Sequence, residues 1–76
     1  MPTVLRQNGF DVMIYTNDHE PAHVHVWKGD GEAVINIEPV LIRNVEGMKK
    51  KEAVKAVAIV EVNRGFLLER WREIHG

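Results

Sequence analysis

The sequence predicts an α+β fold, in which a four-stranded antiparallel sheet made of two hairpins is covered on one face by two C-terminal helices. Three observations predict it: apolar and polar residues alternate within residues 1–44, apolar residues recur at helical spacing within 48–75, and two turn dipeptides separate alternating segments. Strands followed by helices are typical of this class. At 76 residues, the chain is expected to form a single domain.

The first hairpin is predicted from two alternating segments, Thr3–Arg6 and Phe10–Thr16, that flank the dipeptide Asn8-Gly9. Asn and Gly tolerate the positive φ angles that a type I′ turn requires. A two-residue turn fixes the register, which here matches charge with charge and apolar with apolar side chains, Arg6 with Asp11 and Leu5 with Val12. The agreement supports both the hairpin and its register.

A second hairpin is predicted between His23–Lys28 and Glu32–Glu38, with Asp30 and Gly31 as the turn. This register forms apolar pairs on the core face, Val26 with Ile35 and Val24 with Ile37. A slip of one residue would mix polar and apolar side chains on each face, so the hydrophobic pattern favours this pairing.

The opposite face of this hairpin then carries His23, His25 and Trp27, because side chains alternate along a strand. In the predicted register, Glu38 lies across from His23 and Asn36 lies across from His25. We expect the two imidazoles to lie side by side, exposed to solvent and outside the core.

The remaining elements follow Pro39, which cannot donate to a sheet, so Val40–Arg43 is either a short edge strand or an apolar loop. From Met48, apolar residues at helical spacing predict a core-facing helix. Asn63 is expected to cap a second helix by accepting backbone N–H bonds, and Gly65 weakens its first turn. The buried stripe of this helix would be Leu67, Leu68, Trp71 and Ile74.

Charge and composition limit the functions that the whole surface can serve. Ten basic and eleven acidic side chains give a formal net charge of -1, so the molecule lacks the strong positive field of a typical nucleic-acid binder. The absence of cysteine excludes disulfides, thiolate metal sites and a cysteine nucleophile. We find no signal-peptide pattern and no membrane-spanning apolar run, and therefore expect a soluble, cytoplasmic protein.

The stretch NDHEPAHVHV, Asn17 to Val26, holds three of the four histidines and two carboxylates. Two histidines at i and i+2 on a strand lie about 7 Å apart at Cα on one face, close enough to chelate one metal ion. Zinc or another divalent metal would need nitrogen or oxygen ligands besides His23 and His25. His19 or Asp18 from the preceding loop, or Glu38 across the hairpin, could supply the third ligand.

The same histidines could also act without a metal. One imidazole can serve as general base and another as general acid, because imidazole titrates near neutral pH. The catalytic candidates are then His23 and His25 as the acid–base pair and His19 as a third member, with Glu38 orienting His23. Alternatively, the histidines are ordinary polar residues of a half-exposed strand that bond to Asn36 and Glu38. His75 is interpreted as a helix-dipole partner or a frayed tail rather than a ligand.

A concentrated positive patch is formed by Lys49, Lys50, Lys51 and Lys55. Cations at a helix start oppose the helix dipole, so helix stability does not explain them. They could bind phosphate or an acidic partner, and Trp27 could stack on a base; alternatively, the lysines form a solvated helix end.

Four segments, MPTVLR, NDHEPAHVHV, KGDGEA and LLERWREIHG, resemble the bacterial family DUF4160, a domain of unknown function. Some members are similar to toxins of type II toxin–antitoxin pairs, so the resemblance implies a small antitoxin-like partner protein, but it implies no catalytic mechanism. Lys49 stands where many members have a capping Ser or Thr, and Gly65 stands where a helix-favouring residue is usual.

Two functional hypotheses follow. The first is a bacterial component of a toxin–antitoxin-like pair whose histidine face acts on RNA or another phosphate-bearing target. The alternative is a non-enzymatic module that binds a zinc-type metal or a protein partner.

Overall fold

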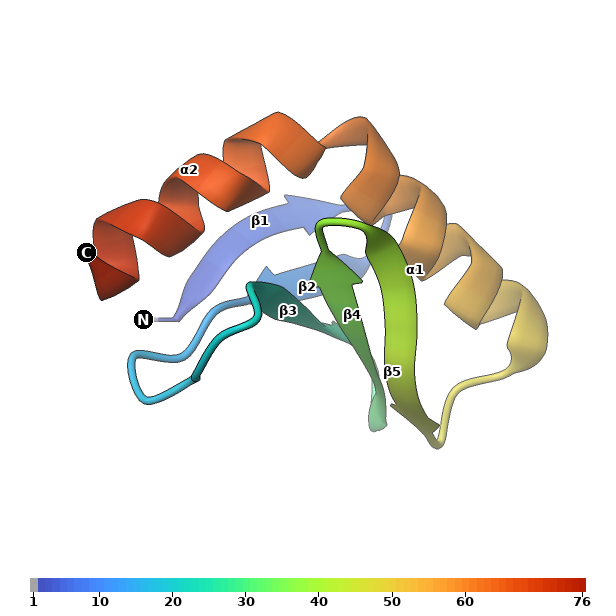
Figure 1. Cartoon of the computed structure of the whole chain (residues 1–76). Helices are drawn as coiled ribbons and strands as arrows, with labels where there is room; N and C mark the ends of the chain where they lie inside the picture. Colours follow the sequence, from blue (N-terminus) through green and yellow to red (C-terminus); the bar gives the residue numbers. More distant parts are fainter. Residues whose placement is uncertain (1) are drawn as a thin grey trace.

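The computed structural model describes residues 2–76 as a five-stranded antiparallel sheet followed by two helices (Figure 1). The strands lie side by side in chain order. The elements are β1 (Thr3–Gln7), β2 (Phe10–Met13), β3 (His23–Lys28), β4 (Gly31–Ile37), β5 (Val40–Glu46), α1 (Lys50–Val62) and α2 (Arg64–His75). The predicted α+β class is confirmed, but the sheet has five strands rather than four.

The additional strand is β5, which pairs antiparallel with β4 at the edge of the sheet. Pro39 lies in the turn before it, so its missing N–H interrupts no strand pairing. Of the two alternatives for Val40–Arg43, the edge strand is therefore confirmed, and the strand continues to Glu46.

The first hairpin has the predicted register, with Leu5 opposite Val12 and Arg6 opposite Asp11. The predicted charge pair also forms, since Arg6 Nε lies 3.1 Å from Asp11 Oδ1. The turn residue Asn8 takes the positive φ angle, 53°, that the turn type requires.

The second hairpin differs from the predicted register by two residues. Its turn consists of Gly29 and Asp30, and Gly29 takes a φ of 59°, so Val24 faces Ile35 and Val26 faces Ala33. Gly31 instead begins β4 as a buried residue, where a Cβ would lie 2.5 Å from the carbonyl oxygen of Gly47. This glycine thus allows a close backbone approach rather than a turn.

A shift of two residues keeps every side chain on its predicted face, because the period of a strand is two. The valines of β3 are therefore buried as predicted, but the partners of the histidines change: His23 pairs with Asn36, and His25 pairs with Val34. Glu38 is not opposite His23 and lies in the turn before β5.

The core lies between one face of the sheet and the two helices, which arch over it in Figure 1. Burying this apolar surface is the main driving force for assembling the layers. The fully or nearly buried apolar residues are Phe10, Val12, Ile14, Val24, Val26, Ala33, Ile35, Ile37, Ala53, Ala56, Ile59, Val60, Leu67 and Trp71. Leu68 and Ile74, predicted for the buried stripe of α2, are partly buried against this core.

Asn63 joins the two helices but does not cap α2 as predicted. Its side chain forms no cap hydrogen bond; instead Nδ2 donates to the carbonyl oxygen of Ile59 at 2.8 Å and to Gln7 Oε1 at 3.0 Å. The amide thus links the end of α1 to β1. Neither helix in residues 2–76 has the length and hydropathy of a membrane-crossing segment.

Candidate metal centre

The loop between β2 and β3 places a carboxylate over the start of β3. Asp18 Oδ2 accepts the backbone N–H of Tyr15 at 3.1 Å, and the backbone N–H of Asp18 donates to the Tyr15 carbonyl oxygen, also at 3.1 Å. These two bonds close a tight turn between Tyr15 and Asp18. In Figure 1 this loop projects from the end of the sheet near the C-terminal end of α2.

Asp18, His23 and His25 converge so that one potential ligand atom from each lies within 4.8 Å of the others. His25 Nε2 lies 3.2 Å from Asp18 Oδ2, and His23 Nε2 lies 3.6 Å from Asp18 Oδ1. Zinc–ligand bonds of about 2.0–2.1 Å in tetrahedral geometry separate neighbouring ligand atoms by about 3.3 Å. The two separations from Asp18, 3.2 and 3.6 Å, are close to this value, as ligands that share one ion require.

Hydrogen bonds on the far side of each imidazole orient its Nε2 atom. His23 Nδ1 lies 2.8 Å from the Pro21 carbonyl oxygen, which can only accept, so we assign a proton to Nδ1. The neutral ring then directs the Nε2 lone pair toward Asp18. His25 Nδ1 lies 2.8 Å from Glu32 Oε2. A carbonyl and a carboxylate behind the ligand nitrogens are the usual outer partners of metal-bound histidines.

His25 lies between two carboxylates, with Glu32 at Nδ1 and Asp18 at Nε2. A neutral imidazole carries one proton and can donate to only one of them. The second contact therefore needs another proton, on the ring or on a carboxyl group, or a cation between Nε2 and Asp18. A divalent ion at this point would also accept the lone pair of His23, which a proton on His25 would not.

The three side chains are largely enclosed, with exposed fractions of 8% for His23, 16% for His25 and 13% for Asp18. We expected both imidazoles to be exposed to solvent. Their shared face is confirmed by ring centroids 5.3 Å apart, but the expected exposure of His23 is wrong. The end of α2 covers it, and the centroid of the Trp71 ring lies 5.3 Å from that of His23.

Several residues near the cluster were not predicted as parts of it. Trp71 Nε1 donates to Glu20 Oε2 at 3.0 Å, which ties the loop to α2. His75 stacks on Trp71 at 3.8 Å, and its Nε2 lies 3.1 Å from the Tyr15 carbonyl oxygen. His75 is thus packed rather than frayed. Its helical spacing of four from Trp71 was visible in the sequence, but the contact with the loop was not.

His19 and Glu38 are not brought into the cluster. His19 is exposed on the loop, and the carboxylate of the neighbouring Asp18 takes the inward position. Glu38 is exposed, and its Oε2 pairs with Arg64 at 3.0 Å. The predicted roles of His19 as ligand or third catalytic member and of Glu38 as ligand or orienting group are therefore not supported by this geometry. Glu32, which sequence reasoning missed, orients His25 instead.

The predicted phosphate-binding residues lie elsewhere. Lys49 precedes α1, and Lys50, Lys51 and Lys55 lie in its first two turns. Lys51 and Lys55 line a groove with Lys28, at the end of β3 opposite His23. Five residue steps of about 3.3 Å separate these ends by ~16 Å, so the lysines and the histidines form two sites rather than one. Trp27 is half-buried, and its indole Nε1 is enclosed without a hydrogen-bond partner in residues 2–76.

The fold and this cluster define a small α+β domain with a candidate metal centre made of two histidines and one carboxylate. Residues 9–72 match the model of the family described as "Domain of unknown function (DUF4160)". The chain belongs to this family, and the resemblance noted from its motifs is confirmed. Comparisons with curated proteins and with solved structures found no match.

Proposed function

We propose that this protein binds a zinc-type divalent metal ion through Asp18, His23 and His25. The observation that carries the proposal is the convergence of one carboxylate and two Nε2 atoms whose rings are oriented from behind by the Pro21 carbonyl and Glu32. Mixed nitrogen and oxygen ligands suit zinc and other divalent transition metals.

Three protein ligands leave a fourth position in a tetrahedral site for water or a substrate oxygen, which is the pattern of catalytic zinc sites. A metal ion in such a site supplies Lewis-acid chemistry. The residues of this chain would hold and orient it: Asp18 from the loop, and the two histidines from a strand whose other face is in the core. The action of the histidine face on RNA and the toxin–antitoxin pairing that the family resemblance implies remain separate predictions.

Calorimetric titration with zinc tests the proposal. We expect one ion per chain, and we expect Asp18→Asn to weaken binding by more than about 100-fold, because changes to outer partners alone cost 10–100-fold. Asp11→Asn is the matched control: it makes the same chemical change on β2, where Asp11 pairs with Arg6. Equal affinity of the Asp18→Asn variant and the parent would disprove the assignment.

A second candidate function, docking of a partner protein, is favoured by one observation. Within residues 2–76, β5 is an edge strand that pairs on one side only. Its exposed apolar residues are Leu41 and Ile42, with exposed fractions of 59% and 39%. Co-expression with the product of an adjacent gene tests this proposal. We expect Leu41→Lys to release such a partner, whereas Val54→Lys, an equally drastic change on exposed α1, should retain it. Release by both or by neither variant would exclude the edge as the docking surface.

A further inference from the structure

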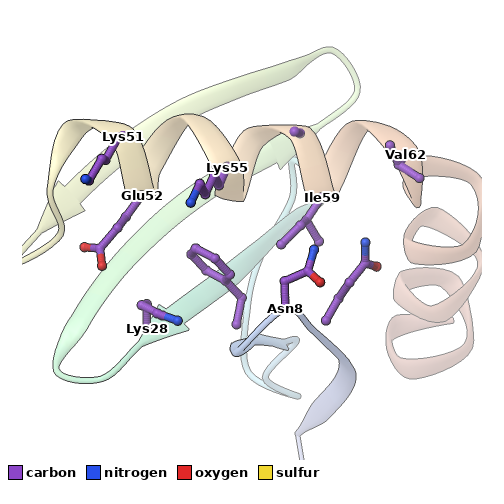
Figure 2. A pocket seen from close by; sticks show the side chains of 10 residues that line it. Asn8, Lys28, Lys51, Glu52, Lys55, Ile59 and Val62 are labelled. Carbon is purple, nitrogen blue, oxygen red and sulfur yellow. The ribbon is translucent and has the colours of Figure 1, made fainter.

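A groove between the first hairpin and α1 lies apart from the histidine cluster and has a volume of about 560 Å³. Figure 2 shows Lys51, Glu52, Lys55, Ile59 and Val62 on the helix along one side and Lys28 and Asn8 on the other. This volume lies within the usual range for small-molecule sites. Two of the lining residues, Phe10 and Ile59, are apolar and buried.

Three lysines from two elements line this groove without forming ion pairs within residues 2–76. Lys51 and Lys55 are one turn apart on α1, and Lys28 comes from the end of β3. The carboxylate of Glu52 accepts the Lys49 backbone N–H at 3.1 Å. Three lysines and this one carboxylate leave the groove with an excess of positive charge, on a chain whose net charge is -1.

Lys28 contacts the first hairpin beside the groove. Its Nζ lies 5.1 Å from the centroid of the Phe10 ring, within range of a cation–π contact. Gly9 leaves room for this ammonium group, since a Cβ there would lie 2.7 Å from Nζ. A charged group that is ordered in advance loses less conformational entropy when it binds an anion.

We propose that this groove binds the phosphate group of a phosphorylated ligand, with Lys28, Lys51 and Lys55 as its charge partners. Several ammonium donors around one groove suit a multiply charged oxyanion. The phosphate could belong to a free nucleotide or to the backbone of single-stranded RNA, which share this chemistry. The site lies at the end of β3 opposite the histidines, so it does not depend on metal binding.

NMR titration of the full chain tests the proposal, with a chelator present so that metal binding has no effect. The probes are inorganic pyrophosphate, adenosine monophosphate and a short single-stranded RNA. We expect amide shifts at Asn8 and Ile59 with at least one of them, and about tenfold weaker binding in Lys28→Gln, Lys51→Gln and Lys55→Gln, because each loses a charge-assisted hydrogen bond.

The matched control is Lys50→Gln, which removes the same charge from a residue that does not line the groove. We expect it to retain nearly the affinity of the parent. Binding of pyrophosphate or the mononucleotide would identify a free phosphorylated ligand, and binding of RNA alone would identify a nucleic-acid strand; both support the proposal. Absence of shifts with all three probes at millimolar concentration, or an equal loss in Lys50→Gln, would overturn it.

Discussion

Glu32 is expected to affect metal binding indirectly, by orienting the imidazole of His25. Its carboxylate contacts His25 Nδ1 at 2.8 Å but is not one of the three converging ligands. We predict that Glu32→Gln lowers zinc affinity by about 10–100-fold, because it weakens the orientation and basicity of the imidazole. A competition titration against a zinc chelator measures this loss. Glu46→Gln, at the residue paired with Glu32 on β5, should have no effect; equal losses would contradict the role.

His23 contributes to stability as well as to the proposed site. It is buried, contacts Trp71 and bonds to the Pro21 carbonyl, although we expected it to lie exposed and outside the core. We predict a loss of about 2–3 kcal/mol in the free energy of unfolding, from the cavity and the lost hydrogen bond. Urea unfolding in a chelator measures it.

The exposed His19 is the control for that measurement. His19→Ala should change the free energy of unfolding by no more than about 0.5 kcal/mol, as is usual for surface substitutions. If His23→Ala were as neutral as His19→Ala, the packing of α2 over the imidazole would not contribute to stability.

At the scale of elements, we predict that replacing glycine by alanine has opposite effects on stability at two positions. Gly31→Ala would place a Cβ 2.5 Å from the Gly47 carbonyl oxygen, where β4 begins, and should cost about 1–3 kcal/mol through overpacking. Gly65→Ala meets no atom within 4 Å in the first turn of α2 and should gain up to about 1 kcal/mol from helix propensity. Thermal unfolding of both variants tests the pair, and destabilisation by Gly65→Ala would contradict it.

The accuracy of the sequence-based predictions also differs between elements. Asn8-Gly9 and the matched pairs beside it predicted the first hairpin with its register. In the second hairpin, either Gly29 or Gly31 could have occupied the turn. Gly31 is instead needed for close packing against Gly47, which is a long-range contact that no local sequence pattern reveals. The predicted register was therefore wrong by two residues. Each side chain was still placed on the correct face, but the contact between Glu32 and His25 was not predicted.

Only part of the candidate site could be predicted from the sequence. Strand periodicity placed His23 and His25 together regardless of the exact register. The third member depended on the conformation of a loop, and the sequence offered Asp18, His19 and Glu38 without deciding among them. The local turn between Tyr15 and Asp18 and the contact of Glu20 with Trp71 select Asp18, and the second of these contacts exists only in the tertiary structure.

At the scale of the whole molecule, metal binding should be coupled to stability. The proposed ligands join a loop to a strand, so an ion bound only by the folded state stabilises it by about 2.7 kcal/mol at 100 times the dissociation constant. For a domain of this size, that corresponds to an increase in Tm of roughly 10–20 °C. Differential scanning calorimetry with and without zinc measures the change. Asp18→Asn should abolish it, and an equal increase in that variant would place the binding site elsewhere.

The order of the strands has a consequence for how the site is assembled during folding. Each strand pairs with its immediate neighbour in the chain, whereas Tyr15 and His75, which close the cover over the cluster, are 60 positions apart. Contacts between near neighbours form early because their loops are short. The cover over the cluster therefore depends on a contact between distant parts of the chain, and we expect it to close only after the strands have paired.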